Sequence, residues 1–483
     1  MLIRNAEIYQ VGMRDLRFED GTVTEIGNLA PLAYETTVDA CGGALLPGLN
    51  DHHLHFLSYA ASLDSIDCSP RNVGNESDFA QLLRSQEESN NWLRGVGYHE
   101  SVAGDIDCHW LDQHCPQRPL RIQHRTGRLW IFNSSGIRLL QKALQQQLAP
   151  TLLSKESLNS GRFYDSDETL APLIGKNLPP VREASKRLSS YGVTGFSDLT
   201  PTNDAESFEL FERCKSDNRI VQQIQLARRA PFTPLSSKQI IPGPIKIHLH
   251  ESRLPPLDDL VERISQSHLA GIPVAIHCVT EIELLFSLAA LEEAGSISGD
   301  RLEHASITPD YSLQRIKDLG LTIVSQPFFI EQKGDSYIRN VEPEAHDLLY
   351  RCQSFLERGI PFAGSSDAPF GGADPWATMR SAIFRKTASG NFLGKEEALT
   401  PERALAIFLG SLEKPADIHS IGVGAPADFC LLLHPWSVCR ERLIKEDIKM
   451  VFAKGNLVYQ KPQEDVAVDY TSIASISPQS SAV

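Results

Sequence analysis

Short apolar segments alternate with helical segments through the middle of the chain, and this alternation limits the possible folds more than any other feature. Eight of the apolar segments have the length and composition of buried strands. They are residues 44–53, 192–199, 220–227, 245–251, 272–279, 301–307, 321–327 and 360–367. This order predicts βα units in a parallel sheet, and the eight segments are enough for a closed (β/α)8 TIM-type barrel.

Both ends of the chain have a different pattern, in which short strands are joined by turns. LRFEDGTVTEIG near the start, with its Asp-Gly turn, and IKMVFAKGNLVYQ near the end are typical of hairpins. We therefore predict an α/β protein in which residues 1–47 and 415–465 form one small β-sandwich domain and residues 48–414 form the barrel. Residues 466–483 are rich in serine and without pattern, which predicts a flexible tail.

Residues 57–190 are too long for a single crossover between the first two barrel strands. They contain mixed segments such as NWLRGVGYHE and LRIQHRTGRLWIFNSSG, which belong to no regular βα unit. We predict that these residues form an insertion subdomain after the first barrel strand and cover one face of the barrel.

The composition excludes several classes of protein. The 46 Lys and Arg are scattered and outnumbered by 61 Asp and Glu, so the formal net charge of -15 argues against nucleic acid or an anionic membrane as partner. The 9 cysteines show no CxxC spacing, which favours a reducing compartment. No apolar stretch is long enough for a signal peptide or a membrane helix. We expect a cytoplasmic globular protein, and the sequence leaves open whether it is a homo-oligomer.

His53 and His55 stand two residues apart at the end of the first predicted barrel strand. Because side chains in a strand alternate between its two faces, both imidazoles point to the same side, as two ligands of one metal ion require. Taken alone, such a pair is also common among surface and core histidines. The remaining candidate ligands decide between these readings.

Three further residues with nitrogen or oxygen donors follow apolar strand segments. His277, His304 and Asp367 stand where barrel strands end, and barrel active sites are built at the carboxyl ends of the strands. Each of them alone could be a core residue with a hydrogen-bond partner. Together with the histidine pair they predict five donors on one rim, which are the donor types that zinc prefers.

Lys246 lies inside an apolar strand, IKIHLHE, where an unpaired ammonium group would lose its hydration at a high cost. One explanation is a buried ion pair with an acid such as Glu251. The other is an amine with a lowered pKa that adds carbon dioxide, because the resulting carbamate is a carboxylate able to bridge two metal ions. The residues themselves do not decide between the two.

These residues occur in an order that is found in a known superfamily. The signature PGxxDxHxH is met by Pro47, Gly48, Asp51, His53 and His55. His52 lies between the ligands and is not one of them. The chain resembles the amidohydrolase superfamily, and within it the YtcJ-like branch, typified by N-substituted formamide deformylases. GVTGFSDL, IKIHLHE and IHCVTEIEL resemble segments of that branch, and the resemblance runs from Leu2 to about Gln460.

The resemblance implies a metal-dependent hydrolase with two divalent ions, which we expect to be zinc. We assign the more buried ion to His53, His55 and Asp367, the more exposed ion to His277 and His304, and the bridge to a carboxylated Lys246. A metal-activated hydroxide would attack the carbonyl carbon of an amide. Asp367 would act first as the general base and then as the general acid toward the departing nitrogen.

The insertion departs from the branch at a position that bears on the substrate. The usual GHxxWxNS segment reads TGRLWIFNS here, with Arg128 at the histidine position and Trp130, Asn133 and Ser134 retained. An arginine in the pocket would favour a carboxylate or another anionic group, although a structural salt bridge would explain Arg128 equally well. The other candidate contacts to the substrate are His250, Tyr98, His99, Gln326 and Trp376.

Two other functions fit parts of this pattern. One is the hydrolytic deamination of a heterocyclic ring. The deaminases of this superfamily resemble one another in having a glutamate three residues after the histidine of the fifth barrel strand, but this chain has Thr280 there and Glu281 one residue later. A non-catalytic barrel scaffold would have lost its ligands, whereas all six ligand positions are filled. We therefore expect a hydrolase that acts on a carbon–nitrogen bond, other than a peptide bond, of a small-molecule amide.

Overall fold

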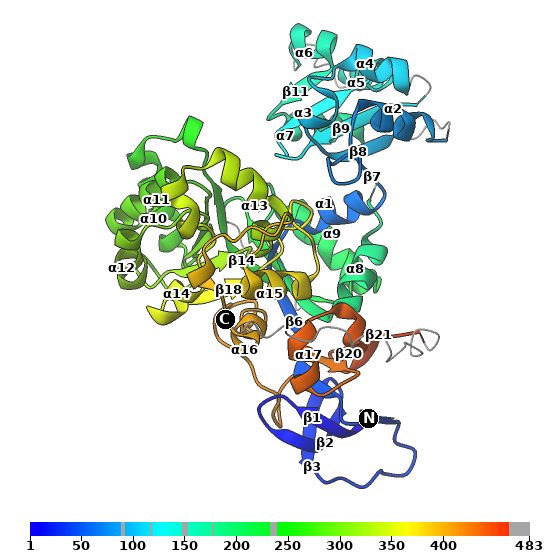
Figure 1. Cartoon of the computed structure of the whole chain (residues 1–483), viewed down its shortest axis with the longest axis vertical. Helices are drawn as coiled ribbons and strands as arrows, with labels where there is room; N and C mark the ends of the chain where they lie inside the picture. Colours follow the sequence, from blue (N-terminus) through cyan, green and yellow to red (C-terminus); the bar gives the residue numbers. More distant parts are fainter. Residues whose placement is uncertain (88–91, 116–117, 147–152, 176–177, 232–238, 463–483) are drawn as a thin grey trace, which may run out of the picture.

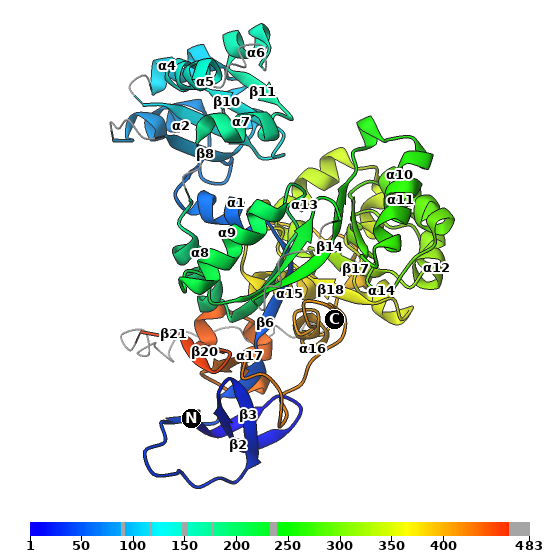
Figure 2. The ribbon, with the colours of Figure 1, turned by 180° about the vertical axis from the view of Figure 1, so that it is seen from behind.

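The computed structural model describes residues 1–87, 92–115, 118–146, 153–175, 178–231 and 239–462. Within these residues the strands form three sheets. Figures 1 and 2 show a central barrel, a lobe of residues that follow its first strand at one end, and a sheet made from the two ends of the chain at the other. All 9 cysteines are free thiols. In the described residues no helix has both the length and the apolar character needed to span a bilayer.

The central sheet has eight parallel strands in sequence order. They are β6 (Leu49–Leu54), β12 (Val193–Asp198), β13 (Gln223–Arg228), β14 (Ile240–His248), β15 (Val274–Cys278), β16 (Arg301–His304), β17 (Thr322–Ser325) and β18 (Phe362–Gly364). Each lies within one of the predicted segments or overlaps it. The prediction of a TIM-type barrel is therefore confirmed.

The loop after β18 brings the last barrel strand next to the first. The N–H of Asp367 donates to the carbonyl of His53 at 2.8 Å, and the N–H of His55 donates to the carbonyl of Ala368 at 2.8 Å. The carboxylate of Asp51 accepts from the N–H of Ser366 at 3.1 Å and from that of His53 at 3.2 Å. These contacts, rather than a strand ladder, nearly close the barrel.

Helices surround the barrel and follow its strands. They are α1 (Phe56–Leu63), α8 (Val181–Ser190), α9 (Ala205–Ser216), α10 (Leu257–Leu269), α11 (Glu281–Ala294), α12 (Asp310–Asp318), α13 (Phe328–Asn340), α14 (Gln353–Glu357), α15 (Pro375–Phe384) and α16 (Pro401–Ala406). Helix α16 begins with a capping residue and a proline. The side chain of Thr400 accepts from the N–H of Arg403, and Pro401 is the first helical residue.

The two ends of the chain meet in one mixed sheet with the order β21-β20-β19-β5-β1-β2-β3, in which β4 pairs with β1. The strands are β1 (Leu2–Ile8), β2 (Gly12–Glu19), β3 (Thr22–Gly27), β4 (Thr37–Asp39), β5 (Ala44–Pro47), β19 (Phe429–Leu432), β20 (Ile448–Ala453) and β21 (Asn456–Gln460). Helix α17 (Trp436–Arg442) follows β19. The sandwich arrangement and the domain boundaries stay predictions, and the expected tail lies outside the described residues.

The insertion has a sheet of its own, with the order β11-β10-β9-β8-β7. Its strands are β7 (Ile66–Asp67), β8 (Leu93–Tyr98), β9 (Leu120–His124), β10 (Leu129–Phe132) and β11 (Arg162–Tyr164). Its helices are α2 (Glu76–Arg84), α3 (Glu100–Ala103), α4 (Cys108–His114), α5 (Ser134–Gln146), α6 (Lys155–Ser160) and α7 (Asp167–Ile174). The turn between β9 and β10 reaches the barrel, since a Cβ atom on Gly127 would lie 2.8 Å from Phe370 Cε1.

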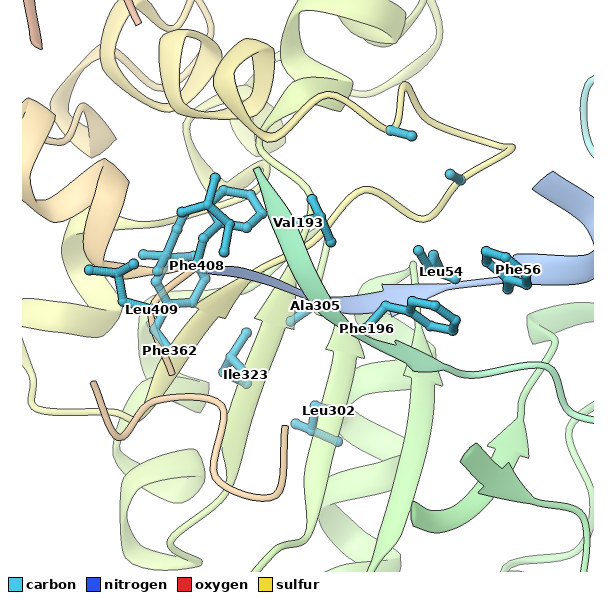
Figure 3. Packing of buried hydrophobic residues seen from close by; sticks show 14 of the residues in the cluster. Leu54, Phe56, Val193, Phe196, Leu302, Ala305, Ile323, Phe362, Phe408 and Leu409 are labelled. Carbon is cyan, nitrogen blue, oxygen red and sulfur yellow. The ribbon is translucent and has the colours of Figure 1, made fainter. Parts of the chain in front are cut away.

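A continuous hydrophobic core joins the barrel strands to their helices. Phe56 of α1 and Phe196 of β12 stack with their ring centroids 4.7 Å apart, and Figure 3 shows the two rings side by side next to Leu54. Both aromatic side chains are fully buried. Burial of such rings supplies much of the free energy of folding, and here it fixes α1 directly after the strand that carries the histidine pair.

Replacement of Phe196 by alanine is expected to lower the free energy of unfolding by about 3–5 kcal/mol, because it leaves a cavity beside Phe56. Urea denaturation followed by circular dichroism measures the change. The control is Phe384→Ala, since this ring is 53 % exposed at the end of α15, and it should shift the free energy by no more than about 0.5 kcal/mol. Equal losses in the two variants would contradict the assignment of the core.

Candidate metal centre

The carboxyl end of the barrel gathers histidine and aspartate side chains from several strands. His53, at the end of β6, His304, at the end of β16, and Asp367, in the loop after β18, each present one possible ligand atom, and these atoms all lie within 4.8 Å of one another. All three residues are buried. Among the described residues this is the one group of histidine, cysteine and acidic residues with that geometry.

His55 and His277 complete the arrangement. His55 Nε2 lies 3.3 Å from Asp367 Oδ1, and His53 Nε2 lies 3.5 Å from the same oxygen. The imidazole of His277 lies next to that of His304, with ring centroids 4.5 Å apart. The structure thus brings together the four histidines and the aspartate that the sequence analysis proposed as ligands.

Three of the histidines are oriented by a partner on the ring nitrogen Nδ1. His53 Nδ1 contacts Glu303 Oε2 at 2.5 Å, His55 Nδ1 contacts Thr200 Oγ1 at 3.1 Å, and His304 Nδ1 contacts Gln326 Oε1 at 2.7 Å. Such partners fix the ring orientation and leave Nε2 free to bind a metal ion. Gln326, which was expected to touch the substrate, therefore lies behind His304, fully buried.

Sequence reasoning did not identify Glu303 as part of the site. It is completely buried on β16, where Arg301 Nε donates to one carboxylate oxygen and His53 binds the other. Burial raises the pKa of Glu303, but the charges of Arg301, His53 and Lys246 lower it by a larger amount. The pKa is therefore below its ordinary value, and the carboxyl group is ionised. The signal in the sequence was a charged pair, Arg301 and Glu303, within a four-residue buried strand.

The buried donors have the protonation states that a metal ion needs. Burial lowers the pKa of His53 to about 3, so its imidazole is neutral. Burial also raises the pKa of Asp367, but the hydrogen bond to His55 and the neighbouring imidazoles lower it by more, which keeps the carboxylate ionised. Neutral imidazoles and a carboxylate are the donor forms that bind a divalent cation.

Lys246 is buried at the centre of this group and has no partner. Its side chain points from β14, the residue is 2 % exposed, and Nζ forms no hydrogen bond in the part of the chain that the structure describes. Burial lowers the pKa of Lys246 to about 8, against the charges of Glu303 and Asp367, which raise it. The described residues contain no ion pair with Glu251, one of the two explanations that the sequence left open.

His248 also faces the centre, although the sequence analysis selected His250 on the same strand. The imidazole of His248 lies 4.2 Å from that of His277 and 5.5 Å from that of His250, measured between ring centroids. Although the residue is exposed, partial desolvation of its ring, followed by the charge of Lys246, lowers the pKa of His248. Because side chains alternate between the two faces of a strand, Lys246, His248 and His250 share one face, and His248 lies closer than His250 to the candidate ligands.

Arg128 does not present a free guanidinium group. Its Nε and Nη2 donate to the two carboxylate oxygens of Asp165 at 2.7 and 2.5 Å, and the arginine side chain is 39 % exposed. The hydrogen bond from Arg128 is the largest influence that lowers the pKa of Asp165, and the charges of Arg253 and His250 add to it. The structure therefore shows the salt bridge that the sequence left open, and a contact between Arg128 and an anionic substrate stays a prediction.

Three other expected substrate contacts lie apart from the histidine cluster. The Tyr98 hydroxyl donates to the carbonyl of Gly104 inside the insertion, and His99 Nδ1 accepts from the N–H of Ser101. Trp376 is fully buried, and its indole N–H donates to the carbonyl of Tyr191, which precedes the start of β12 at the opposite end of the barrel. No contact among the described residues brings these side chains to the ligands.

Substitution of Glu303 by glutamine is expected to weaken zinc binding about 10- to 100-fold, because His53 loses the carboxylate that orients its ring. Titration of the metal-free protein with zinc and a competing chelator measures the affinity. Glu292→Gln is the matched control, since Glu292 pairs with Arg315 at 2.7 Å on the surface and a surface pair contributes little. Unchanged zinc affinity in Glu303→Gln would show that His53 is not a ligand.

Comparison with known proteins agrees with this geometry. Residues 36–459 match the amidohydrolase family. The chain is 24 % identical over 511 residues to YtcJ of Bacillus subtilis (strain 168), named as an amidohydrolase, with 92 % of this chain and 95 % of YtcJ covered. It is also 24 % identical over 454 residues to the N-substituted formamide deformylase of Arthrobacter pascens, with 80 % and 82 % covered.

Solved structures share the fold. An uncharacterised metal-dependent hydrolase from Pyrococcus horikoshii OT3 aligns with a TM-score of 0.73 at 19 % identity, covering 91 % of this chain and 98 % of that one. A second, from Pyrococcus furiosus, aligns with a TM-score of 0.68 at 20 % identity, covering 89 % and 98 %. The match over most of the sequence confirms the resemblance expected from the ligand order. The chain belongs to the amidohydrolase family and is a hydrolase that acts on carbon–nitrogen bonds.

Proposed function

We propose that this protein is a metal-dependent hydrolase that cleaves an amide-type carbon–nitrogen bond of a small molecule. The observation that carries the proposal is the convergence of His53, His304 and Asp367 around the unpartnered Nζ of Lys246. A buried cluster of neutral imidazoles beside an ionised carboxylate is costly unless a cation compensates it. The relative named N-substituted formamide deformylase makes an N-formyl or similar amide the first substrate class to test.

The donors fit two divalent ions, and zinc suits their nitrogen and oxygen atoms. In our assignment His53, His55 and Asp367 would hold one ion, His277 and His304 would hold the other, and Lys246, carboxylated by carbon dioxide, would supply a further carboxylate to both. The unpaired, buried Nζ of Lys246 supports this assignment, because a carbamate there would gain the partners that the ammonium group lacks. A structural relative of the same fold, the chlorohydrolase TrzN of Arthrobacter aurescens TC1, was crystallised with zinc, at a TM-score of 0.52 and 12 % identity over 94 % of both chains.

When bound, the ions would act as Lewis acids that polarise the amide carbonyl and lower the pKa of a water molecule. Asp367 then holds the proton that this water loses. Its Oδ1 already lies 3.3 Å from His55 Nε2 and 3.5 Å from His53 Nε2, at the centre of the donors. The same carboxyl group returns the proton to the departing nitrogen, whose basicity rises as the carbon–nitrogen bond breaks.

The geometry at the end of β15, the fifth strand of the barrel, disfavours the alternative of a ring deaminase. Thr280 caps α11, and the next acidic residue, Glu281, contacts the Tyr311 hydroxyl on the surface. Glu283, one turn into the helix, is occupied by the backbone N–H groups of Val279 and Thr280 at 2.7 and 3.1 Å. Neither carboxylate is free to act as a proton shuttle beside His277. A scaffold without metal is disfavoured by the filled ligand set.

Asp367→Asn is expected to lower kcat by about 10²-fold or more even when the protein is loaded with excess metal, because the amide cannot hold the transferred proton. Steady-state hydrolysis of N-formyl, N-acyl and cyclic amides, with metal analysis of the same samples, provides the measurement. Asp417→Asn is the control, since Asp417 is a surface residue paired with Lys414 at 3.7 Å. Full activity of metal-loaded Asp367→Asn would exclude this mechanism.

Lys246→Met is expected to reduce the metal content from about two ions per chain to one or fewer, since the proposed bridge is lost. Inductively coupled plasma analysis counts the ions, and an anomalous-scattering structure of the wild type would locate them. Lys215→Met is the control for the loss of a half-buried lysine, because Lys215 Nζ binds the carbonyls of Val221 and Gln222 at 3.0 and 2.7 Å. If both variants keep two ions, Lys246 is not a bridge.

A further inference from the structure

Lys333 lies beside the candidate metal centre but belongs to none of its ligand sets. It stands on α13, which directly follows β17, and its Nζ lies 3.6 Å from the ring centroid of Phe329. Phe329 in turn contacts the loop that carries Asp367, since a Cβ atom on Gly371 would lie 3.0 Å from Phe329 Cε1. Figures 1 and 2 show α13 at the end of the barrel that faces the insertion.

The ammonium group of Lys333 has no partner of opposite charge in contact. Among the residues that the structure describes, Lys333 forms no hydrogen bond, and no carboxylate lies within ion-pair distance of Nζ. Burial lowers the pKa of Lys333 to about 8, Asp367 raises it and Arg125 lowers it. The Asp367 carboxylate contacts His53 and His55 instead. A partly buried cation that rests on an aromatic ring is therefore left without a counter-ion.

A second cation reaches the same region from the insertion. Arg125 is exposed at the start of the turn between β9 and β10, and the next residues of this turn pack on Phe370 through Gly127. The Phe370 ring lies 5.6 Å from the imidazole of His55. Burial raises the pKa of Tyr337, which lies in the same helix as Lys333, and the charge of Arg125 lowers it. The charge of Arg125 also lowers the pKa of Lys333. Its guanidinium group forms no hydrogen bond within the described residues.

The side chains around the two cations are apolar, and Phe370 among them is half-buried whereas Phe329 is 3 % exposed. Phe329, Ile330, Leu349, Tyr350 and Leu393 form a separate hydrophobic cluster, against which Ile307, Tyr337, Ile338 and Phe370 pack. Water screens charges weakly beside such a surface, so an anion placed there interacts strongly with the ammonium and guanidinium groups. Two unpaired cations beside an apolar wall are the arrangement expected for a ligand with a carboxylate and an apolar body.

We propose that Lys333 and Arg125 form a subsite for a carboxylate of the substrate, and that the half-buried ring of Phe370, which lies next to His55, contacts the part of the substrate between this carboxylate and the scissile amide. The inference rests on the proposed function and narrows its substrate class to small amides with a carboxylate. The subsite differs from the one expected at Arg128, because the guanidinium group of Arg128 is already bound by Asp165. One cation comes from the barrel and the other from the insertion, so the subsite exists only when both are folded.

The test compares two probes that differ only in charge, N-benzylformamide and its 4-carboxylate derivative. The metal-loaded wild type is expected to hydrolyse the carboxylate probe with a kcat/KM at least about tenfold higher, as a charge-assisted contact allows. Lys333→Met should reduce this ratio about tenfold, and Lys333→Arg should restore most of it. Arg125→Gln, on an exposed turn where folding is not at risk, should reduce the ratio severalfold.

Lys386→Met is the matched control, because Lys386 Nζ also lies over a phenylalanine ring, at 5.1 Å from the centroid of Phe392, on an exposed segment. This variant should keep the ratio of the wild type. Equal rates for the two probes in the wild type, or a ratio that neither Lys333→Met nor Arg125→Gln changes, would overturn the subsite while leaving the hydrolase itself in place.

Binding of 4-methylbenzoate, measured by calorimetry, separates the failure of the subsite from the failure of the proposed function. If the wild type cleaves neither probe but binds this anion at least about tenfold more tightly than Lys333→Met does, the subsite stands and hydrolysis of these amides is refuted. If the wild type cleaves neither probe and the anion binds equally well to both proteins, or to neither, the subsite is overturned as well.

Discussion

The seam between the first and the last barrel strand is the constraint on which the rest of the site depends. Two backbone hydrogen bonds and the carboxylate of Asp51 join residues that lie up to 315 positions apart in the sequence. Because the N–H of Asp367 donates to the carbonyl of His53, the aspartate cannot move without the histidine strand. The proposed ligands from the first and the last barrel strand are therefore held in one place, which would reduce the cost of ordering them around a metal ion.

A polar layer lies behind the ligands and is itself almost free of solvent. Glu303, Thr200 and Gln326 each take one nitrogen of a histidine, and Arg301 compensates the charge of Glu303. This arrangement fixes the orientation of the imidazoles, while Lys246 Nζ has no hydrogen-bond partner among the described residues. A chain that buries so many polar groups together gives up stability, and the proposed metal ions account for the arrangement.

Much of the fold could be predicted because the signals that encode it are local. Apolar runs of strand length, separated by helical segments, identified each barrel strand, and the alternation of side chains placed His53 and His55 on one face. This alternation assigns a face to every residue of a strand but does not say how close that residue lies to a ligand. The sequence analysis therefore chose His250, although His248 lies nearer to the candidate ligands. Glu303 was overlooked because a buried carboxylate gives no periodic signal.

The sequence by itself determined the class of fold and the order of the candidate ligands along the strands, because strand periodicity and ligand chemistry are properties of short segments. The tertiary structure alone decided which charges meet. It pairs Arg128 with Asp165, gives Lys246 and Lys333 no ion-pair partner within the described residues, and brings the turn of Arg125 against the barrel. Such pairings depend on contacts between residues far apart in the chain, and no local pattern of residue types specifies them.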